Sequence, residues 1–535
     1  MYSKGHILRA LGICYINAEE NMTNKPNVNV CSALNGVTII KKQKQLECSI
    51  LAPNSKTILA VSSTPVLEKC DGEGKFIKVE GLVYTKVLYE DIDGTNCVVD
   101  NKCSFADVID VGDAATDFSC LGNVVLSDLD FKTNSADEIK ANFVLNFEIC
   151  VFGENEAQYV ECDSEGLCTL PTEVQISTLL DASTESFAES FEVELGKNVA
   201  RVLDCSATAT VKDVSVSGSQ ILIEGIIVNN IVFETLDDNH TLASKSATYD
   251  FKQTFEIANA EDGANAFVSV YIMSDRLQVV CEDIEGSMLA HIDYPMSAQY
   301  AVVGTKTITS LTDAFSTTNE ISVTNTTQGV FSVVGSINKS EKIDTNVTIE
   351  KDSQTIEKVY SYNINNIDLT KTLIDGDAVL VEGIAYCNII FQSYDRETEL
   401  SGNTSIVAEI PFSTKLGLSG LNADDLIIGK ASPVSVDVRI KRSQELDIIA
   451  EIELNINAVR NLTTTLVSDI EIGEEKPAST SALSLYLVQK GQTYWDIAKQ
   501  LSVNVDELEL QNEDVILPSE KTEKVVYYRQ LQKQC

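Results

Sequence analysis

Short runs in which apolar and polar residues partly alternate recur along the chain and predict β-strands. The run VEGLVYTKVLY, residues 79–89, returns as IEGIIVNNIVF at 223–233 and as VEGIAYCNIIF at 381–391. Each copy places a β-branched residue before Glu-Gly and continues with apolar or aromatic residues, a composition typical of strands. Turn-forming residues follow each copy, so we expect each run to be one strand of a hairpin.

A second element follows each of these runs at a similar distance, in the segments SFADVIDV, DFKQTFEI and PFSTKLGL. Two elements in a constant order indicate an internal repeat. A glycine inside a strand predicts a bulge or a close approach of another backbone, and we expect the glutamate before it to face outward. The repeated residues are Gly81, Gly225 and Gly383 of the first element and Phe105, Phe251 and Phe412 of the second.

These patterns predict a mainly β protein with three tandem antiparallel β-sandwich-like or barrel-like domains and a small C-terminal β-α-α-β domain. Polar, acidic segments without apolar periodicity separate the copies and predict exposed linkers. The predicted bounds are an N-terminal tail at 1–27, a cysteine-rich β domain at 28–155, an acidic linker at 156–180, β domains at 181–308 and 309–463, a linker at 464–483, the small domain at 484–530 and a tail at 531–535.

The pattern changes in the C-terminal segment, where a short strand is followed by two short helical runs and a second strand, KVVYY. Thr493 is placed to cap the first helix, with Asp496 three residues later as in a capping box. Asn504 and Glu507 have the same spacing at the start of the second helix. The segment therefore predicts a β-α-α-β unit of fewer than about fifty residues.

This unit resembles the LysM domain, whose pattern is Tyr-x-Val-x-x-Gly-Asp-Thr-x-x-x-Ile-Ala, followed later by Leu and Asn. The matching positions are Tyr486, Val488, Gly491, Thr493, Trp495, Ile497, Ala498, Val505, Leu508 and Asn512. LysM domains bind N-acetylglucosamine polymers between two loops. By this resemblance the partner- or glycan-binding groove consists of Gly491, Gln492, Thr493, Tyr494, Trp495, Asn512, Glu513 and Asp514. Gln492 replaces the usual Asp and the second loop is short, which favours a protein ligand.

Tandem β domains with this repeated strand, ending in one LysM-like unit, resemble the SPOCS-domain spore coat morphogenetic proteins of spore-forming Firmicutes, of the clostridial type. The resemblance rests on the repeat, on Ile410–Phe412 (IPF) and on the domain order; the cysteine-rich first copy lacks the Ile-Pro. It implies a non-enzymatic scaffold in the mother-cell cytoplasm, at the forespore surface and spore coat. It also implies that the LysM-like unit engages the ATPase scaffold protein of the coat's basement layer.

The charge of the chain excludes some other partners. The chain has 80 acidic and 40 basic residues, a net charge of −40, which repels nucleic acid and anionic lipid headgroups. No apolar run reaches the roughly 18 residues of a membrane span. Arg9 interrupts the short apolar stretch near the N-terminus, so we expect no signal peptide.

Ten of the 14 cysteines lie before residue 169. None belongs to a CxxC motif, and no Cys/His group has the spacing of a zinc site, so we expect no metal. Reduced thiols are the default expectation without an export signal. The alternative is cross-linking after assembly, for which Cys535 is a candidate because a terminal residue is exposed.

Three other functions stay open at this point. For an enzyme, His6, His240 and His291 lie in unrelated segments and the chain has no P-loop, GxSxG or HExxH motif, so we expect neither catalysis nor a cofactor. For a cell-envelope glycan binder, the LysM-like unit is the supporting feature. Self-association into a disulfide-cross-linked layer or fibre is the third. Trp495, the only tryptophan, would anchor a protein partner if exposed.

Overall fold

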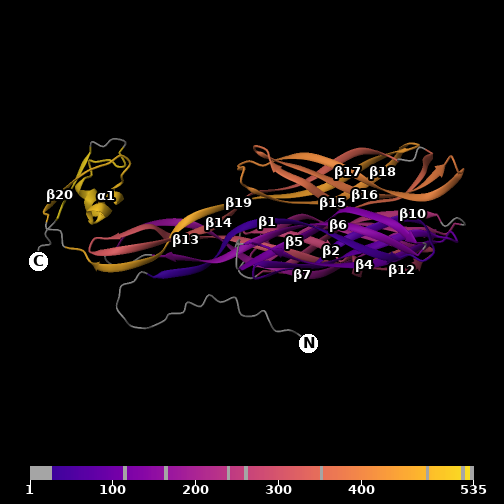
Figure 1. The fold of residues 1–535 in the computed structure, drawn as a ribbon, viewed down its shortest axis with the longest axis horizontal. Helices are drawn as coiled ribbons and strands as arrows, with labels where there is room; N and C mark the ends of the chain where they lie inside the picture. The colour runs from indigo at the N-terminus through magenta and orange to yellow at the C-terminus, as the bar shows by residue number, and fades with distance from the viewer. Residues whose placement is uncertain are drawn as a thin grey trace, which may run out of the picture.

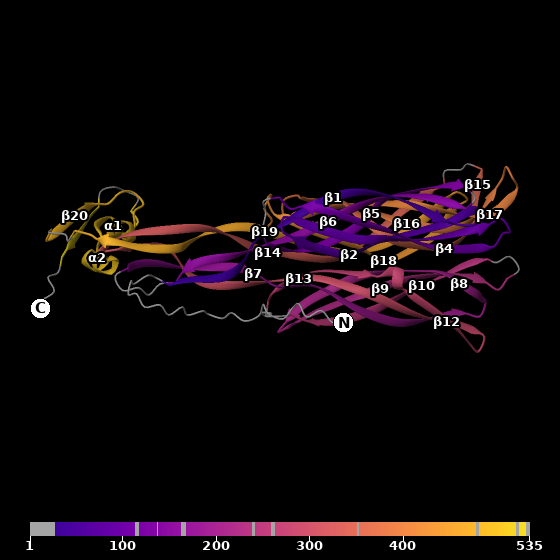
Figure 2. The ribbon, with the colours of Figure 1, turned by 60° about the horizontal axis from the view of Figure 1, so that its bottom comes forward.

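The molecule is elongated, with a body of packed sheets at one end, a narrow stalk of long strands, and a small module at the other end (Figures 1 and 2). The structure is a computed structural model that describes residues 27–112, 117–135, 137–161, 167–237, 241–257, 263–349, 353–477, 481–519 and 524–530. Its β-sheets are antiparallel throughout these ranges, which confirms the mainly β fold. The division into three SPOCS-like domains and the LysM assignment stay predictions.

The strands before the module form three similar sets, which we call units 1, 2 and 3. Unit 1 has the sheets β1-β6-β5 and β2-β3-β4, and unit 3 has β14-β19-β18 and β15-β16-β17. Unit 2 has β10-β9-β8 and a sheet in which β7, β11 and β12 all pair with β13. The strands of unit 1 are β1 (Val28–Leu51), β2 (Ser55–Glu73), β3 (Phe76–Asp91), β4 (Asn96–Asp110), β5 (Asp117–Ser135) and β6 (Glu138–Val160).

Units 2 and 3 follow in the chain, and in each of them, as in unit 1, the first strand pairs with the last. Unit 2 consists of β7 (Leu167–Gly196), β8 (Val199–Ser217), β9 (Gln220–Thr235), β10 (Leu242–Glu256), β11 (Asn265–Ile272), the short 3₁₀ helix η1 (Ser274–Arg276), β12 (Gln278–Ile284) and β13 (Ser287–Ser316). Unit 3 consists of β14 (Asn319–Thr348), β15 (Gln354–Ile374), β16 (Ala378–Asp395), β17 (Leu400–Gly417), β18 (Leu426–Arg442) and β19 (Glu445–Glu475).

The two repeated sequence elements meet in space as one structural feature. In unit 2, Gly225 of β9 lies directly across from Phe251 of β10, and the phenyl ring covers the glycine. A Cβ added to Gly225 would lie 2.6 Å from that ring and 2.4 Å from the carbonyl oxygen of Thr210, so no larger residue fits. The same pairs in units 1 and 3 are Gly81 with Phe105 and Gly383 with Phe412.

A β-bulge lies beside each of these glycines on the other neighbouring strand. The register shifts between Leu67 and Lys69 in unit 1, and equivalent shifts follow Val211 in unit 2 and Asp368 in unit 3. The expectation that the glycine marks a bulge and a close backbone approach is therefore confirmed. The preceding glutamate faces outward as expected and pairs with a lysine of an adjacent strand: Glu80 with Lys69, Glu224 with Lys252, and Glu382 with Lys371.

The stalk consists of the first and last strands of the units, paired as long ribbons. In unit 2, β7 and β13 pair from Leu167 opposite Ser316 to Gly196 opposite Met288. The linkers predicted at 156–180 and 464–483 are therefore wrong over most of their length, because these residues belong to β6, β7 and β19. The predicted domain bounds also fall inside β7, β13 and β19. These segments read as polar because one side of each ribbon faces solvent, as the alternating burial near Ile176 shows.

Each unit has an apolar core of its own, and two smaller apolar clusters join the three units. One apolar cluster joins the ribbon strands of all three units; it contains Leu34, Val37, Cys150, Phe152, Phe267, Ala301, Val303, Phe331 and Val459. A second cluster joins the sheets β2-β3-β4, β10-β9-β8 and β15-β16-β17. It contains Leu59, Leu88, Val232, Leu242, Tyr360 and Ile390. The prediction of tandem domains separated by exposed linkers did not include the side-by-side packing that Figure 2 shows.

Replacing Gly225 with alanine should destabilise the protein by about 2 kcal/mol, because the new methyl group overlaps the Thr210 carbonyl and the Phe251 ring. Urea unfolding should show this as a lower transition midpoint. Gly402→Ala in β17 is the matched control, because a Cβ there meets no atom within 4 Å. That variant should be neutral or slightly more stable, since alanine restricts the unfolded chain. Equal destabilisation by both substitutions would contradict the steric explanation.

Candidate functional site

The C-terminal module is built from β20 (Leu483–Leu487), α1 (Tyr494–Leu501), α2 (Val505–Gln511) and β21 (Val525–Arg529). The Thr493 hydroxyl accepts a hydrogen bond from the Asp496 backbone N–H, and the Asp496 carboxylate accepts one from the Thr493 N–H at 2.8 Å. Asn504 caps α2 by accepting a hydrogen bond from the Glu507 N–H. The expected β-α-α-β order and both helix caps are present.

The structure brings the two predicted groove loops together. The Gly491 N–H donates to the Ser519 carbonyl oxygen at 2.9 Å, and Gly491 has a φ of 83°, a conformation that favours glycine. The Tyr494 hydroxyl lies 2.7 Å from the Asn512 carbonyl oxygen and 2.6 Å from that of Val515. These contacts fix the geometry of the loops.

Several predicted groove side chains stabilise the module itself. Asn512 is buried; its amide donates to the carbonyl oxygens of Leu508 and Tyr527 at 2.8 and 2.6 Å, and its side-chain oxygen accepts from the Tyr527 N–H at 3.0 Å. Gln492 donates to the Tyr486 hydroxyl at 3.0 Å and accepts from a backbone N–H at 2.9 Å. These polar groups are already satisfied within the chain. By contrast, Glu513 and Asp514 are exposed.

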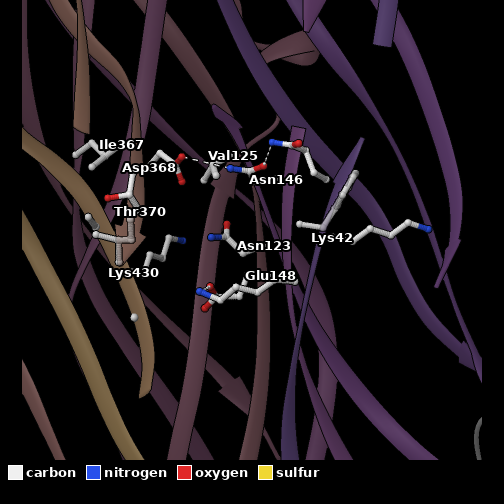
Figure 3. A pocket seen from close by; sticks show the side chains of 15 residues that line it. Lys42, Asn123, Val125, Asn146, Glu148, Ile367, Asp368, Thr370 and Lys430 are labelled. Atoms are coloured by element: carbon white, nitrogen blue, oxygen red, sulfur yellow. Dashed lines mark hydrogen bonds and ion pairs between the residues drawn. The ribbon is translucent and has the colours of Figure 1, made fainter. Parts of the chain in front are cut away.

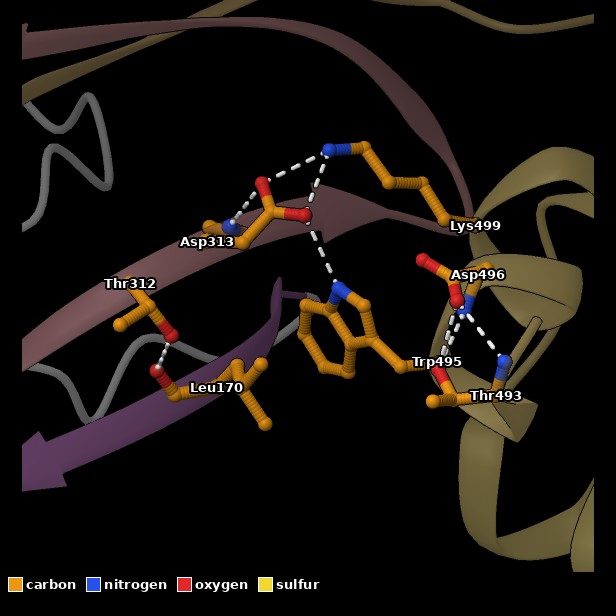
Figure 4. A network of polar contacts seen from close by, with 8 residues as sticks. Leu170, Thr312, Asp313, Thr493, Trp495, Asp496 and Lys499 are labelled. Atoms are coloured by element: carbon orange, nitrogen blue, oxygen red, sulfur yellow. Dashed lines mark hydrogen bonds and ion pairs between the residues drawn. The ribbon is translucent and has the colours of Figure 1, made fainter. Parts of the chain in front are cut away.

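Trp495 packs against the tip of the stalk (Figure 4). Its indole N–H donates to the Asp313 carboxylate of β13 at 2.9 Å, and its ring meets Phe315 edge-to-face with the centroids 5.0 Å apart. Lys499, one turn further along α1, lies 2.7 Å from both carboxylate oxygens of Asp313. Phe315 belongs to the module's apolar core, together with Ile497. Trp495 is thus half-buried, and its contacts here are with residues of the same chain.

The electrostatics of Asp313 favour this docked arrangement. Partial burial by itself raises the pKa of the Asp313 carboxyl, but the hydrogen bonds from Lys499 and Trp495 outweigh burial and hold it below its ordinary value. The carboxylate is therefore charged at neutral pH and accepts three hydrogen bonds from α1.

An exposed apolar surface on the module was missed by the sequence reasoning. Leu485 pairs across the two strands with Tyr527, and Leu487 pairs with Val525, so their side chains share one face. We call this surface the apolar sheet face; it consists of Leu483, Leu485, Leu487, Val525 and Tyr527, all classed as exposed. The alternation in LSLYL was the signal that could have found it. Both views place β20 on the side of the module away from the stalk (Figures 1 and 2).

A polar cavity of about 430 Å³ lies between units 1 and 3 (Figure 3). The Asn146 amide donates to the Asp368 carboxylate at 3.3 Å, and desolvation raises the pKa of Asp368. Desolvation also lowers the pKa of Lys430 to about 8, and its ammonium group lies 4.7 Å from the ring centroid of Tyr271 in unit 2. Polar groups of units 1 and 3 therefore line the cavity, and Lys430 links it to unit 2.

Among the described residues, no group of three or more His, Cys, Asp or Glu side chains could hold a metal ion. No helix in those residues is long and apolar enough to cross a membrane. In unit 2, the Nδ1 atom of His291 lies 3.1 Å from the Oε1 atom of Glu192. The predicted cross-linking residue Cys535, together with His6, His240 and the N-terminal tail, lies outside the described residues.

Two segments of the chain match a known protein family. The family model described as "SipL, SPOCS domain" matches residues 198–275 and 355–443. These two segments are SPOCS domains of the SipL type, which supports a SipL-like SPOCS-domain protein. The matched residues run from β8 to η1 in unit 2 and from β15 into the residue after β18 in unit 3. They include the Gly225–Phe251 and Gly383–Phe412 pairs but not the ribbon strands of the stalk.

No curated protein and no solved structure matches this SPOCS-domain protein significantly. Its family indicates a sporulation-related coat protein and is, in general, a non-enzymatic structural family.

Replacing Asp313 with alanine should undock Trp495 from the stalk, because the indole N–H and Lys499 lose their shared acceptor. The chain has one tryptophan, so its fluorescence emission reports this contact alone and should shift to longer wavelength. Asp344→Ala, at an exposed position of β14, should leave the emission unchanged. An unshifted spectrum for Asp313→Ala would mean that the contact with Phe315 is sufficient.

The docked contact should also weaken in acid. A carboxylate whose folded pKa is lowered stabilises the contact at pH values above its ordinary pKa, and this contribution is lost as pH falls through the lowered value. The tryptophan emission should therefore shift only below the ordinary carboxyl range. The Asp313→Ala variant should lack this acid step, and an identical titration in both proteins would assign the step to other groups.

Proposed function

We propose that this protein is a non-enzymatic scaffold of spore coat assembly, which binds a protein partner through its C-terminal module. Its place of action would be the mother-cell cytoplasm, at the forespore surface and spore coat. The apolar sheet face carries the proposal, because adjacent exposed apolar side chains on one face of a small module are typical of a protein interface. Its position at the end of the stalk leaves the body of the molecule free to contact other coat components.

The proposed partner is the ATPase scaffold protein of the coat's basement layer, which the family resemblance implies. The partner surface should combine apolar side chains with a basic rim, since the module's exposed α2 residues and second loop are acidic: Asp506, Glu509, Glu513 and Asp514. In this proposal Glu513 and Asp514 belong to the rim of the interface. Gly491, Thr493 and Tyr494 shape the loops, and Trp495 holds the module on the stalk.

Glycan binding by the predicted groove is the less favoured function. Sugar recognition needs polar side chains free to pair with hydroxyl groups. The Gln492 amide and the buried Asn512 amide already have partners within the module. A protein ligand on the opposite, apolar side of the sheet needs no rearrangement of these bonds.

Replacing Leu485 with aspartate in the full-length chain should weaken binding to the ATPase scaffold by at least about tenfold, because a charge is placed in the centre of an apolar interface. Biolayer interferometry with the immobilised partner would measure the loss. Leu400→Asp is the matched control: Leu400 is 68% exposed and Leu485 is 69% exposed, but Leu400 lies at the start of β17 in unit 3. The control should bind like the unchanged protein.

Two further measurements separate the alternatives. Saturable binding to chitin oligomers or purified peptidoglycan that is unaffected by Leu485→Asp, with no binding to the ATPase scaffold, would overturn the proposal. Light scattering with and without reductant would detect self-association. A large assembly that dissociates only in reductant would instead favour a disulfide-cross-linked layer.

A further inference from the structure

Unit 1 is a sandwich whose two sheets meet at their edges along two seams. The sheet order β1-β6-β5 faces the order β2-β3-β4, so the edge strand β2 lies beside β5 and the edge strand β1 lies beside β4. Among the described residues of unit 1, no continuous ladder of backbone hydrogen bonds joins the two sheets, since β2 and β5, like β1 and β4, belong to separate sheets. Side chains must therefore close both seams.

A pair of cysteines lies at the β2–β5 seam. The sulfur atoms of Cys70 and Cys120 are 3.5 Å apart, and the Cys120 thiol also lies 3.1 Å from the carbonyl oxygen of Cys70. Gly122 allows this approach, because a Cβ on it would lie 2.9 Å from the Cys70 sulfur. The two thiols need to move by only about 1.5 Å to reach the length of a disulfide bond.

A second pair of cysteines lies at the β1–β4 seam. Cys48 and Cys103 lie close enough for each thiol to shift the pKa of the other. The Asn101 amide lies 3.1 Å from the Cys48 sulfur, and Cys103 lies 3.8 Å from the carbonyl oxygen of Glu47. All four cysteines are half-buried, so a small reagent can reach them without unfolding the unit.

The two other units have no thiol at equivalent positions. Cys103 lies opposite Val83, two residues after the repeated glycine; Tyr249 and Ile410 hold the equivalent positions in units 2 and 3. Cys70 lies opposite Val79, two residues before that glycine; Val214 and Thr372 hold its equivalent positions. The thiol pairs are therefore additions to a shared framework that does not need them.

We propose that Cys70 with Cys120 and Cys48 with Cys103 are oxidation sites that form two intramolecular disulfides, one across each seam of unit 1. The oxidant is a low-molecular-weight disulfide. One cysteine thiolate attacks it, forms a mixed disulfide and releases one small thiol. The second cysteine thiolate then attacks the protein sulfur of the mixed disulfide and releases the other small thiol. Each protein disulfide thus costs one molecule of small disulfide, which takes up the two electrons and two protons.

Raised pKa values at three of the four thiols slow the attack by those thiols in the folded protein at neutral pH. Burial raises the pKa of Cys48, and burial together with the neighbouring Cys48 raises the pKa of Cys103 to about 12. The hydrogen bond with Cys120, then burial, raises the pKa of Cys70. Since the thiolate is the attacking species, the reduced state should persist until small disulfide is in excess or the pH rises.

The test uses the full-length protein, folded and fully reduced, incubated at mildly alkaline pH with excess oxidised glutathione. Remaining thiols are blocked with N-ethylmaleimide, and the protein is digested and mapped by mass spectrometry. We expect linked peptides joining Cys70 to Cys120 and Cys48 to Cys103, both lost on reduction. The midpoint of thermal unfolding of the oxidised protein should rise by about 5 °C or more.

Two variants serve as controls. Cys120→Ser should abolish its own link and leave the Cys48–Cys103 link, and Cys281→Ser, at an exposed cysteine of β12, should leave both links. If Cys120→Ser does not fold, the map of the unchanged protein decides. Blocked, unlinked thiols at the four positions would overturn the proposal, as would different pairings or links between molecules. A single link would overturn it for the other seam.

Discussion

The pairing of the first strand of each unit with its last strand is the constraint on which the rest of the structure depends. It brings both ends of a unit to the same place, so the chain leaves each unit where it entered. Three ribbons made this way lie side by side and bury one side of each against the others. The long strands gain stability from this shared apolar core, since an isolated two-stranded ribbon is marginal in water. The stalk, the packed body and the distant module all follow from it.

The repeated glycine and phenylalanine show how much of the fold could be predicted from the sequence. Their constant order revealed the repeat, and the rule that a strand glycine marks a bulge or close contact held at Gly225, where the Thr210 carbonyl occupies the space of a side chain. The packing of the units could not be predicted. The acidic, polar segment before residue 180 resembled a linker because burial on one side of a ribbon leaves few apolar residues, such as Ile176.

In the candidate site, too, the local interactions were predicted from the sequence and the non-local ones were not. The Thr493 and Asn504 caps were predicted because each capping bond spans three residues. The role of Trp495 was not, because its acceptor Asp313 lies 182 residues earlier and no local pattern pairs the two. The exposed sheet face around Leu485 was also missed, since the alternation that places it on one side of the strand does not say which side is covered.

The apolar clusters that join the three units change what three copies can do. Separate domains on flexible linkers would multiply weak contacts through their effective concentration. Units that share apolar clusters instead hold their outer surfaces in fixed positions, so binding at one unit does not require ordering of the next. Trp495 and Lys499 extend this fixed arrangement to the module, because they tie α1 to the end of β13. The apolar sheet face is then held at a set distance from the body.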